Sequence, residues 1–351
     1  MTFDRVHIQR SQEFERRVES GLSDTTDADI TGFVVHYATD TDSDQQTAVD
    51  PQFEIGYQFE HLDEVFPGRI PDQVLDLVEL AVATFGVDRY IERSIVAGED
   101  IDDSEARLNT RSIHLRFPVL SDNFGDRAAE RLLSSLVSHQ TRDVIEYEFT
   151  SPSLLAGETV QTRLSGPTPT DVISLFSDGL DSAGGVYQNR TDGVTAEYLS
   201  LRYGSGLGQV HETASSELEV DPIDIGVQFR GDSNEFTNFS RGFLHWAFAT
   251  AVAIAFDAQE IRSFETGLMA RFALLSEAWH TTRTVSPVAV QLYNQFLSNV
   301  IDHEIQLVNP FSGDTKTEVV ERIENESVVR NAVSCPHYGK QGEYDLHNCG
   351  Q

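Results

Sequence analysis

The sequence is short of basic residues, and above all of lysine. Its 351 residues include 57 acidic and 25 basic side chains, a formal charge of −32, and the two lysines are Lys316 and Lys340. Self-repulsion of this size is tolerated in concentrated salt, where the screening length falls to about 3 Å near 1 M. We therefore expect a halophilic protein. An acidic disordered chain is the alternative, but 39% hydrophobic residues and periodic apolar segments favour folded domains.

Long hydrophobic runs are also missing. No stretch of about 18 apolar residues occurs and residues 1–21 carry charges throughout, so we expect neither a membrane span nor a secretory signal, and a cytoplasmic location. No basic face is evident, which argues against direct nucleic-acid binding. Cysteine is confined to Cys335 and Cys349, and in a cytoplasmic chain such clustering favours a metal or reactive site over a structural disulfide.

The length predicts about two domains. The turn-forming, non-periodic stretch Ser165–Thr170 is the expected linker, between an N-terminal α+β domain of unknown role (residues 1–165) and a second domain (residues 171–351). Apolar periodicity in the first domain predicts two helices and a strand, at Gln73–Phe85, Asp126–Leu136 and Ser112–Leu120. The nearby arginines are interpreted as salt-bridge partners rather than anion ligands: Arg89, Arg93 and Arg111.

The second domain alternates strand and helix patterns. The segments are 172–176, 183 onward, 196–201, 212–218, 223–229, a buried alanine-rich helix at 242–258 and a strand at 261–264. Such alternation predicts parallel strands joined by helices, hence an α/β fold with a Rossmann-like parallel sheet.

One segment of this domain carries a chemical signal. Residues 171–182 form a buried strand, a tight polar loop and the start of a helix. At such a junction the free backbone N–H groups, the helix dipole and the hydroxyls of Ser177 and Ser182 suit a phosphate group. An ordinary strand-to-helix turn capped by serine and aspartate remains open from the residues alone.

The loop Ser177-Asp178-Gly179-Leu180-Asp181-Ser182 resembles the Ser-Gly-Gly-x-Asp-Ser signature of the PP-loop (N-type) ATP pyrophosphatases, in which the loop holds the pyrophosphate of ATP. Four of the five fixed positions match. Asp178 replaces a glycine, and a carboxylate near phosphates is repelled unless a cation lies between them. Aspartate tolerates left-handed backbone better than most residues, so the loop shape can survive.

Further segments resemble the 7-cyano-7-deazaguanine synthases of this superfamily. They are the strand at 198–204, the arginine-led helix at 240–246 with Arg241, the glycine turn at Gly267, and the segment 309–318, which ends in Thr-Lys-x-Glu with Lys316 at the lysine position. The resemblance covers residues 171–351. It implies an adenine nucleotide alpha hydrolase-like fold in which the loop, Arg241 and Gly267 hold ATP.

The C-terminal cysteines resemble the end of the same synthases, where four thiolates bind Zn²⁺. Cys335 and Cys349 match the first two, and His337 or His347 could supply nitrogen ligands, although the spacing favours four cysteines. The chain stops inside the motif, so we expect the remaining two cysteines in a continuation of the polypeptide. A two-cysteine disulfide is the alternative.

The resemblance implies C–N ligase chemistry of queuosine or archaeosine biosynthesis. ATP with Mg²⁺ adenylates 7-carboxy-7-deazaguanine, ammonia displaces AMP, and a second ATP-driven step yields the nitrile, with Asp181 and Lys316 as catalytic residues. The N-terminal extension suggests specialised deazaguanine modification or antiviral defence, and a homodimer is among the expected assemblies. Two alternatives stay open: a PP-loop enzyme of tRNA modification, and a degenerate nucleotide-binding scaffold subunit, which Asp178 favours.

Overall fold

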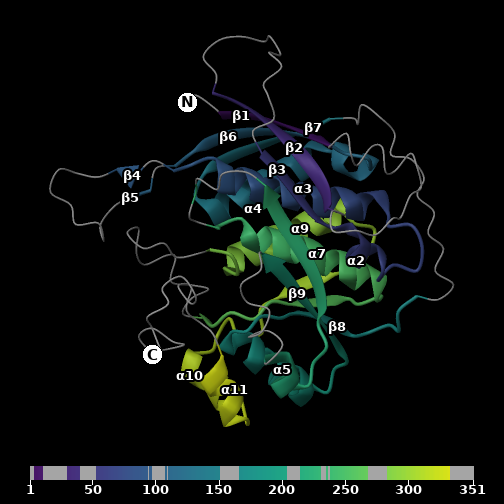
Figure 1. Ribbon diagram of the computed structural model, residues 1–351, viewed down its shortest axis with the longest axis vertical. Helices are drawn as coiled ribbons and strands as arrows, with labels where there is room; N and C mark the ends of the chain where they lie inside the picture. Colours follow the sequence, from purple (N-terminus) through teal and green to yellow (C-terminus); the bar gives the residue numbers. More distant parts are fainter. Residues whose placement is uncertain are drawn as a thin grey trace.

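The computed structural model describes residues 4–10, 30–39, 53–93, 95–96, 107–108, 110–150, 166–203, 214–230, 235, 238–267 and 283–332. They form an α/β structure built on one ten-stranded, mostly parallel sheet (Figure 1). The predicted α/β class is confirmed.

The C-terminal half contributes five parallel strands. They are β8 (Val172–Leu175), β9 (Ala196–Tyr203), β10 (Ile223–Arg230), β11 (Glu260–Arg262) and β12 (Gln306–Val308). The helices of this half are α5 (Leu180–Asp192), α7 (Arg241–Ala255), α9 (Pro287–Val300), α10 (Lys316–Glu321) and α11 (Glu326–Asn331). The strand order is β10-β9-β8-β11-β12. If the five strands of this half are numbered 1 to 5 along the chain, their order in the sheet is 3-2-1-4-5. This order is compatible with a Rossmann-like fold.

The N-terminal half repeats this strand order. Its sheet strands are β1 (Asp4–Arg10), β2 (Ile30–Thr39), β3 (Phe53–Gln58), β6 (Ser112–Pro118) and β7 (Val144–Thr150). Its helices are α2 (Phe59–Asp63), α3 (Asp72–Tyr90), the 3₁₀ turn η2 (Asp122–Gly125) and α4 (Arg127–Thr141). The order is β3-β2-β1-β6-β7, with β2 running against its neighbours. A separate two-stranded pair joins β4 (Ile95–Val96) to β5 (Arg107–Leu108).

The two halves meet through antiparallel pairing of β3 with β10, where Val227 lies opposite Tyr57. The sheet thus continues across the predicted boundary at residues 165–171, and one cluster of buried hydrophobic residues draws on both halves. The N-terminal region was expected as a separate α+β domain; in the structure it supplies half of a shared sheet and of a shared core.

Helices α3, α4, α7 and α9 lie in the space around which the sheet curves (Figure 1). Helix α3 packs against α7, and α4 packs against α9, so helices at equivalent positions of the two halves contact each other. At the sheet's two outer strands, α4 also packs on β7 and α9 on β12. Since α4 and α9 touch, the two ends of the sheet curve toward each other around the helices.

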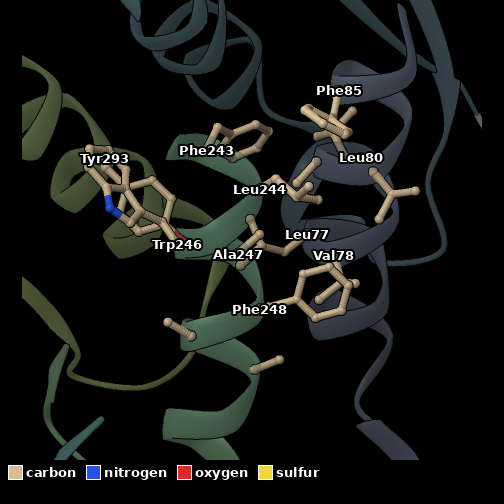
Figure 2. Packing of buried hydrophobic residues seen from close by; sticks show 14 of the residues in the cluster. Leu77, Val78, Leu80, Phe85, Phe243, Leu244, Trp246, Ala247, Phe248 and Tyr293 are labelled. Atoms are coloured by element: carbon tan, nitrogen blue, oxygen red, sulfur yellow. The ribbon is translucent and has the colours of Figure 1, made fainter. Parts of the chain in front are cut away.

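Helix α7 lies at the centre of this arrangement (Figure 2). Leu244, Ala247 and Phe248 face α3, while the ring of Trp246 lies 5.1 Å from that of Tyr293 on α9. Apolar side chains on several faces explain why the sequence predicts a buried helix here, a prediction that the structure confirms. Among the described residues, no helix is long and apolar enough to cross a membrane.

A buried charge network ties the N-terminal half to the start of α7. Asp88 of α3 pairs with Arg93 at 3.0 Å and Arg111 at 2.5 Å, and both guanidinium groups also reach Asp143 at 2.5 Å. The N–H and hydroxyl of Ser240 donate to Asp88 at 2.9 and 2.8 Å. Burial raises the pKa of Asp88, but attraction to the two arginines and the bond from Ser240 outweigh it and lower that pKa. The predicted salt-bridge role of Arg93 and Arg111 is confirmed.

Replacing Asp88 with asparagine should cost about 3–5 kcal/mol of folding free energy, because it leaves buried guanidinium charge undercompensated. The matched control is Glu326→Gln, which breaks the exposed Arg330–Glu326 pair and should cost less than about 1 kcal/mol. Denaturant unfolding in molar KCl measures both. Equal losses for the two variants would contradict this role of the network.

Candidate active site

The loop after β8 has the layout expected of a phosphate site. Gly179, in extended conformation, precedes the first residue of α5, and no side chain caps the helix there. The Ser177 N–H donates to Ser182 Oγ at 3.0 Å, and the two hydroxyl oxygens lie 2.9 Å apart. The serine pair closes the loop while the first N–H groups of α5 stay directed toward it, as at anion-binding helix starts.

This loop lies at the point where the strand order reverses. Strand β8 pairs with β9 on one side and with β11 on the other, both in parallel. In open α/β sheets, ligands bind beyond the carboxyl ends of the strands at such a reversal. The residues that follow β11, among them Glu265 and Gly267, therefore lie at the same end of the sheet as the loop.

Two predicted residues meet here. The Nζ atom of Lys316 lies 2.9 Å from Asp181 Oδ2, although the residues are far apart in the chain. The second oxygen, Asp181 Oδ1, is buried and has no hydrogen-bond partner among the described residues. Half of the Asp181 carboxylate is thus available for a cation or a donor from outside the protein.

The Thr-Lys-x-Glu segment has a structural purpose as well. Thr315 caps α10 by accepting from the Glu318 N–H at 3.3 Å, and Glu318 accepts from the Thr315 N–H at 2.7 Å. This reciprocal capping box fixes the start of α10. Lys316 is the first residue of that helix, so the box holds it beside Asp181.

Glu265 is a site residue that the sequence did not reveal. The side chain of Asn309 holds its backbone: the Glu265 N–H donates to Asn309 Oδ1 at 3.2 Å, and Asn309 Nδ2 donates to the Glu265 carbonyl at 2.9 Å. Burial, followed by the negative charge of Asp181, raises the pKa of Glu265 to about 7, against the opposing charges of Lys316 and Arg241. A single glutamate after a strand belongs to no recognisable sequence motif. The one feature of the sequence that could have drawn attention to Glu265 is its position two residues before Gly267.

Arg241 and Gly267 complete the set. Arg241 is the exposed first residue of α7, and its charge reaches Glu265. A Cβ added to Gly267 would lie 2.4 Å from the carbonyl oxygen of Ser312, so this position has room only for glycine. The Gly267 N–H donates to the carbonyl of Asp314 at 2.9 Å, which joins the end of β11 to the segment that leads into Lys316.

The predicted nucleotide-binding residues thus lie near the carboxyl ends of β8 and β11, where the charge of Arg241 also acts on Glu265. Two qualifications apply. The Leu180 side chain is buried in a hydrophobic cluster with Phe176 and Val186, so only its backbone can serve a ligand. Asp178 is part-buried in the loop. The predicted zinc ligands, Cys335 and Cys349, lie outside the described residues.

A groove of about 520 Å³ adjoins the site on the outer side of α9. Asn309 and Ser312, which contact Glu265 and Gly267, form part of its wall. The other described lining residues are uncharged: Val285, Pro287, Val290, Gln291, Asn294, Gln295 and Ser298. A neutral, amide-rich wall suits an uncharged polar molecule.

No family model matches the chain, and a search of curated proteins finds no match either. The functional argument therefore depends on the residues of the site.

The raised pKa of Glu265 predicts a pH-dependent stability. In the unfolded chain this carboxyl ionises near its ordinary pKa of 4.5, but in the folded protein only near about 7. Between these values the unfolded state binds fewer protons, so stability falls as pH rises and levels off above about 7. Glu265→Gln should remove about 1–3 kcal/mol of this fall. Glu304→Gln, at an exposed turn, should keep the wild-type profile; parallel profiles for the wild type and Glu265→Gln would refute the assignment.

Proposed function

We propose that this chain binds ATP at the loop Ser177–Ser182 and uses it to activate a carboxylate by adenylation. The observation that carries the proposal is the pairing of Lys316 with Asp181 at the start of α5, at 2.9 Å, beside the partly buried Glu265. A cation, an incompletely paired carboxylate and free helix N–H groups at a strand-order reversal suit a triphosphate. The finer fold that we propose is adenine nucleotide alpha hydrolase-like.

The residues fit ATP together with Mg²⁺. Among the described residues, no group of three His, Cys, Asp or Glu side chains could hold a metal ion. Magnesium, however, is commonly bound by one or two carboxylates together with substrate phosphates and water. Asp181 Oδ1, buried and without a partner in the described part of the chain, is the ligand that we assign. Bound there, the ion would neutralise phosphate charge and offset the carboxylate of Asp178.

The first step would form an acyl adenylate. An oxygen of the substrate carboxylate attacks the α-phosphorus, a new P–O bond forms, the α–β anhydride bond breaks, and pyrophosphate leaves. The first N–H groups of α5 and the hydroxyls of Ser177 and Ser182 stabilise charge on the departing pyrophosphate. Lys316, a compact point charge, serves the same end.

The second step would form the amide. Ammonia attacks the acyl carbon, the C–N bond forms, the bond to AMP breaks, and one proton leaves the nitrogen. Glu265 is suited to take that proton, because a base works best with a pKa near the working pH and that of Glu265 is about 7. A second ATP would then adenylate the amide oxygen, with release of pyrophosphate and of one N–H proton. Cleavage of the C–O bond to AMP and loss of the second N–H proton would give the nitrile.

The proposed acceptor is a 7-deazaguanine that bears a carboxylate, such as 7-carboxy-7-deazaguanine, with ammonia as the nitrogen donor. The motif resemblance at residues 177–182, 241, 267 and 316 supports this choice. The second candidate is a nucleotide-binding scaffold subunit without turnover. The observation that favours it is charge: Asp178, Asp181 and Glu265 place three carboxyl groups near two cations, Lys316 and Arg241.

The test is the nucleotide product formed by the full chain in molar KCl with Mg²⁺, ATP, ammonium and 7-carboxy-7-deazaguanine. We expect AMP and pyrophosphate. Asp181→Asn and Lys316→Ala should each lower kcat/KM by about 10²- to 10³-fold, since each removes a group that meets developing charge. Asp192→Asn, at the other end of α5, is the matched control and should retain activity.

The outcomes separate the candidates. ATP binding without AMP formation, by folded protein, would favour the scaffold subunit. ADP as product, or equal losses in Asp181→Asn and Asp192→Asn, would refute the proposed chemistry.

A further inference from the structure

Helices α7 and α9 differ from the other described helices in that they lack an acidic residue in the first turn. Among the described helices, α3, α4, α5, α10 and α11 carry an acidic residue in the first turn, which complements the helix dipole, whereas α7 and α9 carry none. Arginines stand there instead: Arg241 opens α7, and Arg283 lies three residues before Ser286, the N-cap of α9. In a chain with 57 acidic residues, this reversal calls for a reason.

The two helix starts lie against each other. A Cβ added to Gly242 would lie 1.9 Å from Thr284 Cγ2, so the start of α7 touches the residue after Arg283. From the N-terminal half, Gln140 of α4 donates its Nε2 to the Thr284 carbonyl at 3.3 Å. Gln140 is 1% exposed, yet its Oε1 has no hydrogen-bond partner among the described residues. A buried, unpartnered amide oxygen is costly unless something outside the protein meets it.

Cationic groups gather at the same junction. The buried Nε of Arg283 has no partner among the described residues. Arg142, at the end of α4, lies with its guanidinium 5.9 Å from the centre of the Phe239 ring, and His139 lies 2.7 Å from Ser286 Oγ. Burial and then the charge of Arg283 lower the pKa of both Arg142 and His139.

Structural roles explain this cluster only in part. The carboxyl end of α4 favours a cation at Arg142, but that does not account for Arg283 beside a helix start. Arg142 also has a left-handed backbone, with φ of 64°, where glycine is less strained, so its side chain is retained at some cost.

We propose that one cluster of side chains binds the carboxylate group that ATP activates. This anion-binding cluster consists of Arg142, Arg283, His139 and Gln140. An anion relieves the repulsion between the arginines, and guanidinium groups bind carboxylates in paired hydrogen bonds. A ligand that also carries an N–H group can donate to Gln140 Oε1. Because Thr284 touches Gly242, the residue after Arg241, the cluster adjoins the Arg241 side of the candidate nucleotide site. It gives the N-terminal half, which supplies α4, a part in substrate recognition. The inference rests on the proposed carboxylate activation.

The test compares two ligands that differ in one group. Calorimetry on the full chain, without ATP, measures Kd for 7-carboxy-7-deazaguanine and for its uncharged amide. Wild-type protein should bind the carboxylate at least about 10-fold more tightly, a gain of about 1.4 kcal/mol. Arg283→Gln should abolish that preference, and Arg283→Lys should keep part of it. The matched control is Arg330→Gln, at the exposed pair on α11, which should keep all of it. Arg142→Gln, with folding checked by circular dichroism, is the second variant.

The possible results distinguish failure of the anion-binding cluster from failure of the proposed nucleotide site. If the carboxylate and the amide bind equally to wild-type protein, or if the preference survives both Arg283→Gln and Arg142→Gln, the cluster is not the carboxylate site. If neither ligand binds while ATP does, the inference fails and the nucleotide site stands. If the carboxylate preference depends on Arg283 but ATP does not bind, the cluster stands and the proposed adenylation fails. Inorganic phosphate that competes as well as the carboxylate would show an unspecific anion site and would also overturn the assignment.

Discussion

The carboxylate of Asp88 is buried, and its charge is stable there only because Arg93, Arg111 and Ser240 surround it. Through these contacts one carboxylate of the N-terminal half fixes the beginning of α7, a helix of the C-terminal half. The residue after Ser240 is Arg241, whose charge reaches Glu265 in the candidate site. The shared sheet and the four enclosed helices bring the halves together, and this network sets the position of the helix that connects them to the site.

Scarcity of positive charge makes its placement informative. Several described arginines lie beside carboxylates, as in the pairs Arg202–Asp224, Arg262–Asp192 and Arg322–Asp314. Two further groups of cations lie near the candidate site: Lys316 and Arg241, which share it with Asp181 and Glu265, and the cluster around Arg283. Both lie near the start of α7. An acidic chain that keeps cations in these two places is suited to bind two anionic substrates side by side.

Much of the fold followed from the sequence. Strong periodicity predicted α3, α4, β6 and α7, and alternating patterns predicted β8, β9, β10 and β11; the edge strand β12 was not predicted. What the sequence could not show was that β3 would pair with β10, because strand pairing depends on contacts between distant segments rather than on local pattern. The turn-rich stretch at 165–170 was therefore interpreted as a boundary between separate domains, although one sheet and one core extend across it.

The residues of the candidate site also fall into two groups, those that the sequence predicted and those that it did not. Loop residues such as Asp181 and Ser182 form a contiguous motif and could be named in advance, as could Lys316, one of two lysines. Glu265 and Asn309 could not, because each acts through a neighbour brought close by the fold and neither belongs to a local pattern. The Arg283 cluster was hidden for the same reason: its members come from α4 and from the segment before α9.

The most direct test of the central claim is a crystal structure of the full chain with Mg²⁺ and an ATP analogue whose α–β bridge is a methylene group. The account predicts the triphosphate against the first turn of α5, with Lys316 on a phosphate and Asp181 Oδ1 on the ion. An analogue bound elsewhere on the sheet, or a loop at Ser177–Ser182 that makes no phosphate contact, would contradict it.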